Sequence, residues 1–403
     1  MTTIDKVMRF WDSRPCNRFH SPSAVGSRQY YEEVEERKYF VEPHIPAFAD
    51  FNRWAGKNVL EVGCVDKETE YLSPTGWKSI ADYDGGLVMQ YHLGGSADFV
   101  QPIAYIKRKQ KEFLHFKTKY GIDQVLTPDH KVLCWKLKGG DRRLIQTVVT
   151  AKDFAEEHKR LKLGNKAKFQ TSFSPIISTS LPLTDDQLRV QVMFLADGNI
   201  RKNNRKCKLA FVKQRKIDRA EFLLKSANIE FNKKIYGRVT EINFNPPLRV
   251  KTYKDFWRAS LHQLNVIAEE CLNWDGSRNS FYTRDKDSAD FIHYVFAATG
   301  KRSVMRSDLK KTDLKLDYRI HANSDSMTSM EGKPKSEINN VLSPDGFAYC
   351  FNVPSGFLVL RRGGNIFITG NCGIGTDTIN FARAGAYVVA VDLSPRSLEI
   401  AQQ

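Results

Sequence analysis

The sequence predicts a multidomain chain: an all-β domain that contains an inserted α+β domain and is flanked by two fragments of a Rossmann-like α/β domain. Three observations support this. The chain has 403 residues, too many for one ordinary domain. Its two ends carry the halves of one glycine-rich pattern, and the long segment between them is strongly basic. We expect five consecutive parts, at residues 1–63, 64–175, 182–325, 335–371 and 372–403.

Composition limits the class of protein. Hydrophobic residues make up 41% of the chain, which is enough for sizeable cores. We find no apolar run of roughly 18 residues or more and no signal peptide, so we predict a cytoplasmic protein without a membrane partner. Seven scattered cysteines, an odd number, favour free thiols over a disulfide framework.

The positive charge is confined to the middle of the sequence. The chain has 62 basic and 46 acidic residues, a net charge of +16. Residues 1–63 hold 9 of each sign and residues 372–403 hold 2 basic and 3 acidic, so residues 64–371 hold 51 and 34. A basic surface attracts polyanions, and we therefore expect this segment to bind nucleic acid, with solubility alone as the alternative.

The two ends fit together as one nucleotide-binding unit. Residues 57–63 read KNVLEVG, and residues 372–394 read CGIGTDTINFARAGAYVVAVDLS. Joined directly, they form a strand, a glycine loop, a helix, a second strand and an acidic residue. The glycines allow the backbone to approach a cofactor closely, and the acid suits ribose hydroxyls.

The joined unit resembles motif I of class I S-adenosylmethionine-dependent methyltransferases. The resemblance implies that S-adenosylmethionine would be bound by Glu61, Gly63, Gly373, Gly375 and Asp392. A βαβ turn that binds another nucleotide is the alternative. The resemblance covers only the two flanks and does not identify the methyl acceptor.

The segment between the halves begins with Cys64 and ends with Asn371, which is followed by Cys372. Both of its ends predict short strands, with turns at Pro74-Thr75-Gly76, Asp84-Gly85-Gly86 and Gly363-Gly364-Asn365. Short β-rich pieces that are separated by a large insertion resemble the split splicing (Hint) domain of inteins.

The junction residues suit the splicing chemistry that this resemblance implies. Cys64 can attack the Gly63 carbonyl and form a thioester, and Cys372 can then capture the upstream segment. Cyclisation of Asn371 cuts its bond to Cys372, and an S-to-N shift leaves Gly63 joined to Cys372. These steps need no cofactor.

Other positions match or depart from the intein pattern. Thr127 and His130 have the T-x-x-H spacing, which implies that His130 protonates the scissile amide nitrogen and that Thr127 stabilises the oxyanion. Cys350 lies where inteins carry Asp or Cys, and a catalytic role and a packing role both stay open. Gly370 replaces the His that usually assists asparagine cyclisation.

Residues 182–325 contain two helix-like runs that end alike. VQVMFLADG (Val190–Gly198) and AEECLNWDG (Ala268–Gly276) each end in Asp-Gly and lead into basic, strand-like sequence. The pair resembles the motif of LAGLIDADG homing endonucleases, with a second copy that is degenerate at Glu269, Glu270 and Asn273. The alternative is that each Asp-Gly merely ends a helix.

This second resemblance implies Mg²⁺-dependent DNA cleavage. Side-by-side helices would bring Asp197 and Asp275 together to hold the ion between scissile phosphates. The partner would be double-stranded DNA at the uninterrupted insertion site, contacted by Arg201, Lys202, Arg205, Lys206, Lys208, Lys213, Arg215 and Lys216. Whether cleavage activity is retained is a separate question, because such nucleases often decay.

Together these inferences predict a monomeric precursor that removes residues 64–371 and joins its flanks into a methyltransferase. Two alternatives stay open: a methyltransferase with a stable DNA-binding insertion, and self-cleavage without ligation.

Overall fold

The computed structural model describes residues 63–370 except 120, 139–140, 161–165, 201–206, 310–315 and 332–335, and outside this range residues 58–59, 387–388 and a few positions between 22 and 40. By its contacts the chain divides into two units, one of residues 63–371 and one of the two flanks together. Among the described residues, no helix is long and apolar enough to span a membrane.

In the flanking unit, two short strands far apart in the sequence pair with each other. Strand β1 (Asn58–Val59) runs parallel to β26 (Tyr387–Val388). The predicted cofactor residues Glu61, Gly373, Gly375 and Asp392 lie outside the described residues.

The larger unit contains a β-rich frame that is built from two separate segments. The first comprises β2 (Glu70–Ser73), β3 (Gly76–Ser79), η3 (Ile80–Asp82), β4 (Val88–Tyr91), β5 (Ser96–Val100), β6 (Ala104–Lys109), β7 (Glu112–Thr118), β8 (Asp123–Leu126), β9 (Lys131–Lys138), β10 (Asp141–Thr150), α4 (Ala151–Arg160), β11 (Lys166–Gln170) and β12 (Ser174–Pro175). The second comprises β21 (Met327–Glu331), β22 (Ser336–Leu342), β23 (Phe347–Asn352), β24 (Phe357–Arg362) and β25 (Asn365–Gly370).

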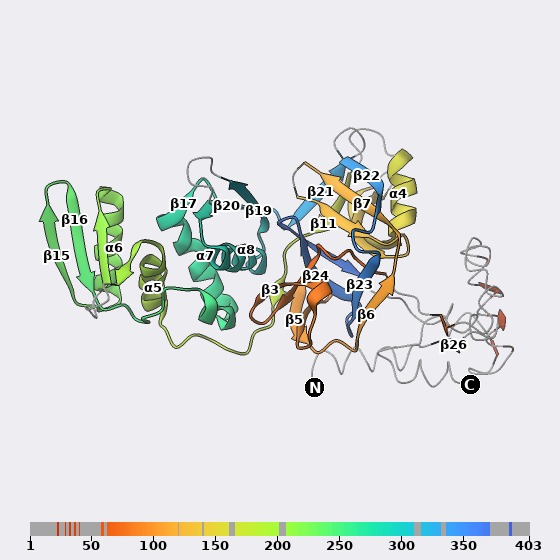
Figure 1. Cartoon of the computed structure of the whole chain (residues 1–403), viewed down its shortest axis with the longest axis horizontal. Helices are drawn as coiled ribbons and strands as arrows, with labels where there is room; N and C mark the ends of the chain where they lie inside the picture. The colour runs from red at the N-terminus through yellow and green to blue at the C-terminus, as the bar shows by residue number, and fades with distance from the viewer. Residues whose placement is uncertain are drawn as a thin grey trace. The chain divides into compact units, whose positions relative to one another are not determined.

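The two segments of the frame interleave strand by strand. Strand β21 pairs with β11, β22 with β7, β23 with β6, and β24 with β2 and β4. Figure 1 shows this as blue strands of the second segment beside orange strands of the first, for example β23 beside β6. Neither segment could complete these sheets alone.

Two of the predicted turns are confirmed as hairpins. Ser73 lies opposite Gly76 between β2 and β3, and Arg362 lies opposite Asn365 between β24 and β25. In the second hairpin Gly363 and Gly364 have φ of 54° and 72°, a left-handed pair that matches the twist of the strands and favours glycine.

Residues between the two frame segments form a structural repeat. The first copy is α5 (Asp185–Asp197), β13 (Asn199–Ile200), β14 (Cys207–Phe211), α6 (Gln214–Ser226), β15 (Phe231–Tyr236) and β16 (Val239–Phe244). After η4 (Lys254–Arg258), the second copy is α7 (Leu261–Asp275), β17 (Gly276–Ser277), β18 (Ser280–Thr283), α8 (Lys286–Ala298), β19 (Arg302–Leu309) and β20 (Leu316–Asn323). The strand orders, β13-β14-β16-β15 and β17-β18-β20-β19, are equivalent.

The repeat also holds at the level of single residues. Helices α5 and α7 both begin with a capping box, Thr184 with Gln187 and Ser260 with Gln263, and both end in the predicted Asp-Gly. They pack against each other. The two predicted helix-like runs are therefore confirmed as the ends of paired helices.

The insertion and the frame share a sheet and a hydrophobic core. Strand β19 of the insertion pairs with β25 of the frame, with Val304 opposite Asn365. One core cluster contains Trp77 of the frame together with Phe291 of α8. Arg361 of β24, which is fully buried, forms ion pairs with Glu70 of β2 and with Asp290 of α8.

Candidate functional site

Cys64 is fully buried between two neighbouring segments of the frame. The next residue, Val65, bridges to Leu126 on one side and to Tyr349 on the other. The Thr127 N–H donates to the Cys64 carbonyl at 2.9 Å, and the Cys64 N–H donates to Thr127 Oγ1 at 3.0 Å. The Thr127 hydroxyl therefore lies at the nitrogen of the predicted scissile bond, whereas the sequence pattern had assigned it to the carbonyl oxygen.

His130 is a neutral imidazole with a defined tautomer. Burial lowers the pKa of His130 to about 4, so the ring is uncharged at neutral pH. Its Nε2 lies 2.6 Å from Thr369 Oγ1. The Thr369 hydroxyl donates its own proton to the Lys131 carbonyl at 3.0 Å, so its oxygen accepts from His130 Nε2–H. The Nδ1 atom of His130 consequently carries a lone pair and no proton.

This Nδ1 lone pair lies beside the predicted scissile bond. Nδ1 is buried, and the Gly63 backbone interacts with the ring and acts to raise its pKa. A Cβ atom placed on Gly63 would lie 2.7 Å from His130 Cα and 2.9 Å from Nδ1, closer than side-chain contacts allow. Glycine at position 63 is therefore what lets the imidazole approach the backbone here.

Cys350 lies opposite Cys64 in the strand register. Val65 and Tyr349 exchange both backbone hydrogen bonds, at 2.8 and 2.9 Å. In an antiparallel pair the next opposed residues, here Cys64 and Cys350, form a closely spaced pair with side chains on one face. Both cysteines are buried, and neither forms a disulfide. The register thus brings Cys350 next to the predicted nucleophile.

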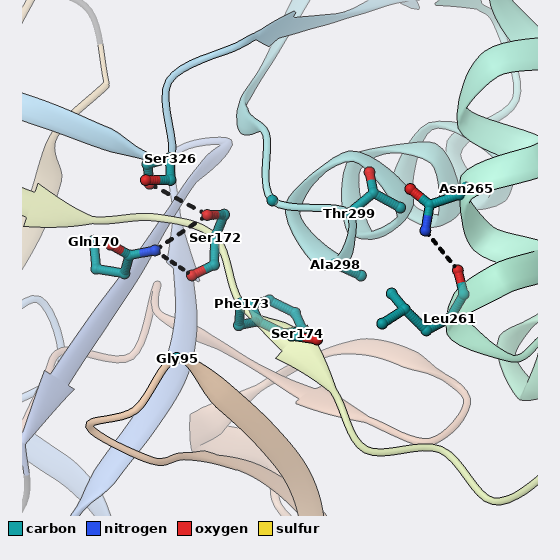
Figure 2. A pocket seen from close by; sticks show the side chains of 11 residues that line it. Gly95, Gln170, Ser172, Phe173, Ser174, Leu261, Asn265, Ala298, Thr299 and Ser326 are labelled. Atoms are coloured by element: carbon teal, nitrogen blue, oxygen red, sulfur yellow. Dashed lines mark hydrogen bonds between the residues drawn. The ribbon is translucent and has the colours of Figure 1, made fainter.

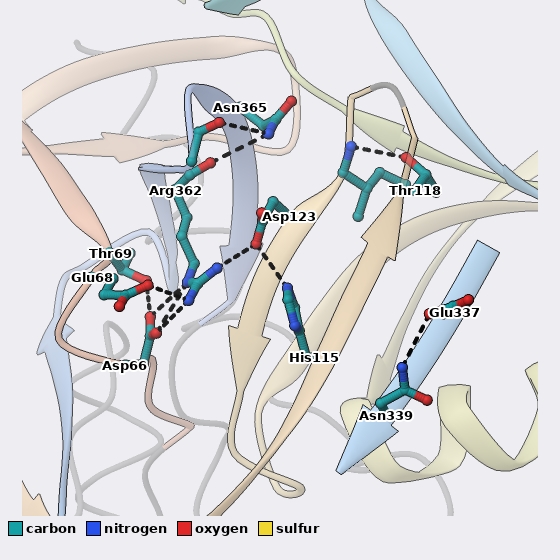
Figure 3. A network of polar contacts seen from close by, with 12 residues as sticks. Asp66, Glu68, Thr69, His115, Thr118, Asp123, Glu337, Asn339, Arg362 and Asn365 are labelled. Atoms are coloured by element: carbon teal, nitrogen blue, oxygen red, sulfur yellow. Dashed lines mark hydrogen bonds and ion pairs between the residues drawn. The ribbon is translucent and has the colours of Figure 1, made fainter. Parts of the chain in front are cut away.

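A charged network holds the residues that follow Cys64 (Figure 3). Arg362 Nε donates to both carboxylate oxygens of Asp66 at 3.1 and 3.0 Å, and its other nitrogens reach Glu68 and Asp123. His115 in turn contacts Asp123 at 2.9 Å. Burial raises the pKa of Asp66 despite this pairing. The network anchors the start of the frame to the hairpin that precedes β25.

The far junction is described only up to Gly370, because Asn371 and Cys372 lie outside the described residues. A Cβ atom on Gly370 would lie 2.8 Å from Lys131 Cβ and 3.2 Å from the Lys131 carbonyl oxygen. The close approach of Lys131 leaves little room for a side chain at position 370, which accounts for glycine there.

In the insertion, Asp197 and Asp275 stand at the ends of the paired helices α5 and α7. Burial and the charge of Asp197 raise the pKa of Asp275, so the two carboxylates are close enough to repel each other. Lys216 Nζ forms an ion pair with Asp197 at 2.5 Å, and Lys251 Nζ donates to the Phe194 carbonyl at 2.6 Å. Two ammonium groups therefore reach the end of α5.

The glycine after each of these acids is required by packing. A Cβ atom on Gly198 would lie 2.3 Å from Phe194 Cδ2, and one on Gly276 would lie 2.3 Å from the Leu272 carbonyl oxygen. Both glycines have negative φ, so space and not a left-handed backbone selects them.

The acid pair is a partial donor set for a metal ion. Within the described part of the chain, no group of three or more His, Cys, Asp or Glu side chains could hold a metal. Mg²⁺, however, is commonly held by one or two carboxylates together with substrate phosphates and water. Burial, and after it the charge of Asp197, raise the pKa of Asp275 although Lys216 and Lys251 act to lower it, and a bound cation would act in the same direction as these lysines. Asp197 and Asp275 therefore fit a Mg²⁺ site whose remaining ligands a bound phosphate and water would supply.

The positions that look degenerate in α7 form a buried ion cluster. Glu270 is fully buried and accepts from Arg189 of α5, Arg219 of α6 and the Trp274 indole. Arg189 also reaches Glu269 at 3.1 Å. Charge pairing thus contributes to the contact between α5 and α7.

Several of the predicted DNA-contacting residues already have partners inside the insertion. Lys208 pairs with Glu241, Lys216 with Asp197, and Arg215 donates to the Asn273 carbonyl at 2.9 Å. Lys213 precedes α6 as its N-cap residue. The remaining four, Arg201, Lys202, Arg205 and Lys206, lie outside the described residues.

A cavity of about 390 Å³ lies where the frame meets the insertion (Figure 2). Its lining includes Gln170 and Ser172 from the frame and Leu261 and Asn265 from α7. It contains none of the residues discussed above, and we assign it no chemistry.

Comparison with known proteins gives weak similarities of two kinds. No protein-family model matches this sequence. The ribonucleoside-diphosphate reductase subunit beta of Aquifex aeolicus (strain VF5) is 23% identical over 363 residues. The match covers 77% of this chain and 50% of that protein, so this chain spans about half of its length. At this identity the match does not establish a family.

Similar solved structures include a split intein and LAGLIDADG proteins. A class 3 split intein in a splice-inactive form is 10% identical, with a TM-score of 0.29 over 77% of this chain and 99% of its own. The homing endonuclease I-DmoI in complex with DNA and Mn is 9% identical, with a TM-score of 0.26 over 34% of this chain and 89% of its own. The N-terminal LAGLIDADG domain of DUF199/WhiA is 8% identical, with a TM-score of 0.26 over 35% and 78%.

Proposed function

We propose that residues 64–371 are a protein-splicing element that excises itself and joins Gly63 to Cys372. The observation that carries the proposal is the buried, neutral His130 imidazole, whose Nδ1 lies beside the Gly63–Cys64 bond. A buried neutral imidazole at this place is explained if the ring takes part in a reaction at this bond.

The first step can be written from these residues alone. His130 Nδ1 accepts the Cys64 thiol proton, and the thiolate adds to the Gly63 carbonyl carbon. When the carbon–nitrogen bond breaks, His130 returns the proton to the nitrogen, which the Thr127 hydroxyl holds. A thioester and a free amine result. Cys372 then receives the acyl group, directly or after transfer to Cys350, and cyclisation of Asn371 releases the element.

We also propose that the insertion binds double-stranded DNA at the uninterrupted insertion site and cleaves it. Support comes from the acid pair, the paired helices and the basic excess of residues 64–371. Asp197 and Asp275 would hold Mg²⁺, which supplies charge stabilisation at the scissile phosphate.

For the flanks we propose a methyltransferase that binds S-adenosylmethionine once they are joined. The parallel pairing of β1 with β26 supports this, because parallel neighbours in a βαβ unit need a crossover connection. A βαβ unit for another nucleotide is the alternative, and titration of the joined product with S-adenosylmethionine distinguishes the two.

Expression of the chain and its separation on a denaturing gel tests the splicing proposal. We expect the precursor of 46.2 kDa to give a free fragment of residues 64–371 and a product that joins residues 1–63 to 372–403, identified by mass spectrometry. A Cys64→Ala, Asn371→Ala double variant is the matched control and should remain one band. Persistence of the unaltered chain as one band would favour a stable insertion, and two unjoined flanks would favour cleavage without ligation.

A further inference from the structure

We propose that Arg108 is the electrostatic partner of the Cys64 thiolate in the first splicing step. This role goes beyond the motif residues, and it rests on the proposed splicing function. Arg108 belongs to none of the motifs that the sequence shows, and it is the penultimate residue of strand β6.

The strand register places Arg108 on the same face as both thiols. In the β6–β23 pair, Arg108 lies opposite Ala348 and Ile106 lies opposite Cys350. Opposed residues share a face, and so do residues two apart, so Arg108 shares the face of Cys350. Cys64, which is opposed to Cys350 in turn, projects to that face too. Ala348, which lies opposite Arg108, has a small side chain and therefore leaves space on this face between the Arg108 guanidinium and the two thiols.

Arg108 is anchored to the loop that carries the other reactive groups. Its Nη2 donates to Asp129 Oδ1 and Oδ2 at 3.1 and 2.8 Å, and Asp129 directly precedes His130. Its Nε is buried and has no hydrogen-bond partner within the part of the chain that the structure describes, and a side-chain hydrogen bond to Cys64 is among the causes that raise the pKa of Arg108.

The electrostatics agree with this geometry. Burial acts to lower the pKa of Arg108, but the negative charges of the Cys64 thiolate and of Asp129 outweigh it and the pKa is raised. An always-protonated guanidinium stabilises a thiolate without competing for its proton. His130 takes that proton, and Arg108 balances the sulfur charge until the carbon–sulfur bond forms. Among the described residues, Thr127 and Cys350 also lie next to Cys64.

Arg108→Gln tests the proposal in an Asn371→Ala background, which stops the reaction at the thioester. The readout is the pH profile of cleavage at Gly63–Cys64 by added dithiothreitol. If thiolate formation shifts by about one pH unit, cleavage should slow about tenfold at pH 7 and recover toward pH 9. Arg108→Lys should keep most of the rate. Arg284→Gln, which removes a similar Arg–Asp pair in the insertion, is the matched control and should leave the profile unchanged.

Two results would overturn the role of Arg108. One is an unchanged profile in Arg108→Gln; the other is a loss that is equal at every pH and is not rescued by Arg108→Lys, which would indicate a purely structural ion pair with Asp129. Circular dichroism excludes unfolding, and Arg108→Lys remains informative if Arg108→Gln does not fold. Absence of cleavage in the parent would instead contradict the splicing proposal itself.

Discussion

The frame and the insertion hold their reactive groups in contrasting ways. In the frame, Cys64 and His130 have exposed fractions of 0% and 1%, and main-chain hydrogen bonds position them. In the insertion, the Asp197 side chain is 26% exposed and forms an ion pair with Lys216. The difference suits the two proposed chemistries: an intramolecular reaction needs no ligand and gains from a closed site, whereas DNA cleavage needs room for phosphate and an exchangeable cation.

The two regions also differ in how charge is balanced. The frame keeps a neutral imidazole by burial, and the insertion keeps carboxylates beside Lys216 and Lys251. Yet the two regions share a core and the Arg361–Asp290 ion pair. The two regions therefore have separate candidate reactive groups but pack together through one hydrophobic core and an ion pair.

The largest expected effect comes from His130→Ala. Loss of the base should slow dithiothreitol-induced cleavage at Gly63–Cys64 by about 100-fold or more, the usual contribution of acid–base catalysis. Thr369→Val, which keeps the ring but removes the acceptor at Nε2, should cost less. DNA cleavage by the His130→Ala protein should be unchanged; its loss would show that the two sites are not chemically separate.

An intermediate effect is expected for Gly63→Ala. The added methyl group would overlap His130 Cα and Nδ1 and displace the ring. We expect the first step to slow about tenfold, equivalent to about 1.4 kcal/mol of barrier. Gly94→Ala is the matched control, because nothing lies within 4 Å of a Cβ atom there. Equal rates in both variants would mean that His130 does not rely on a bare backbone at position 63.

The smallest effect on splicing is expected from Asp197→Asn and Asp275→Asn. Each should abolish Mg²⁺-dependent cleavage of DNA that spans the uninterrupted site, while splicing stays within about twofold of the parent, with or without chelator. Asp186→Asn, at the exposed start of α5, is the control for DNA cleavage. Loss of splicing in both acid variants, with the fold intact, would make the insertion part of the splicing machinery.

The local sequence pattern was sufficient to predict those features that depend only on residues close together in the chain. The hairpin at Gly363-Gly364, the helix ends at Asp197 and Asp275 and the T-x-x-H spacing of Thr127 and His130 can all be read along the chain, because turns, caps and short loops are set by local backbone geometry. Cys64, the predicted nucleophile, can likewise be identified from the sequence alone.

Only the tertiary structure decided how those residues are positioned. The tautomer of His130 depends on Thr369, 239 residues away, and the segment after Cys64 is held by Arg362, 296 residues from Asp66. The positions of Arg108 and Lys251 beside the candidate sites were also shown only by the tertiary structure. Strand pairing between the two frame segments brings these groups together. The register of this pairing is set by the strand faces that are buried against each other, and these strands are separated in the sequence by the whole insertion. A local sequence pattern therefore does not contain the register.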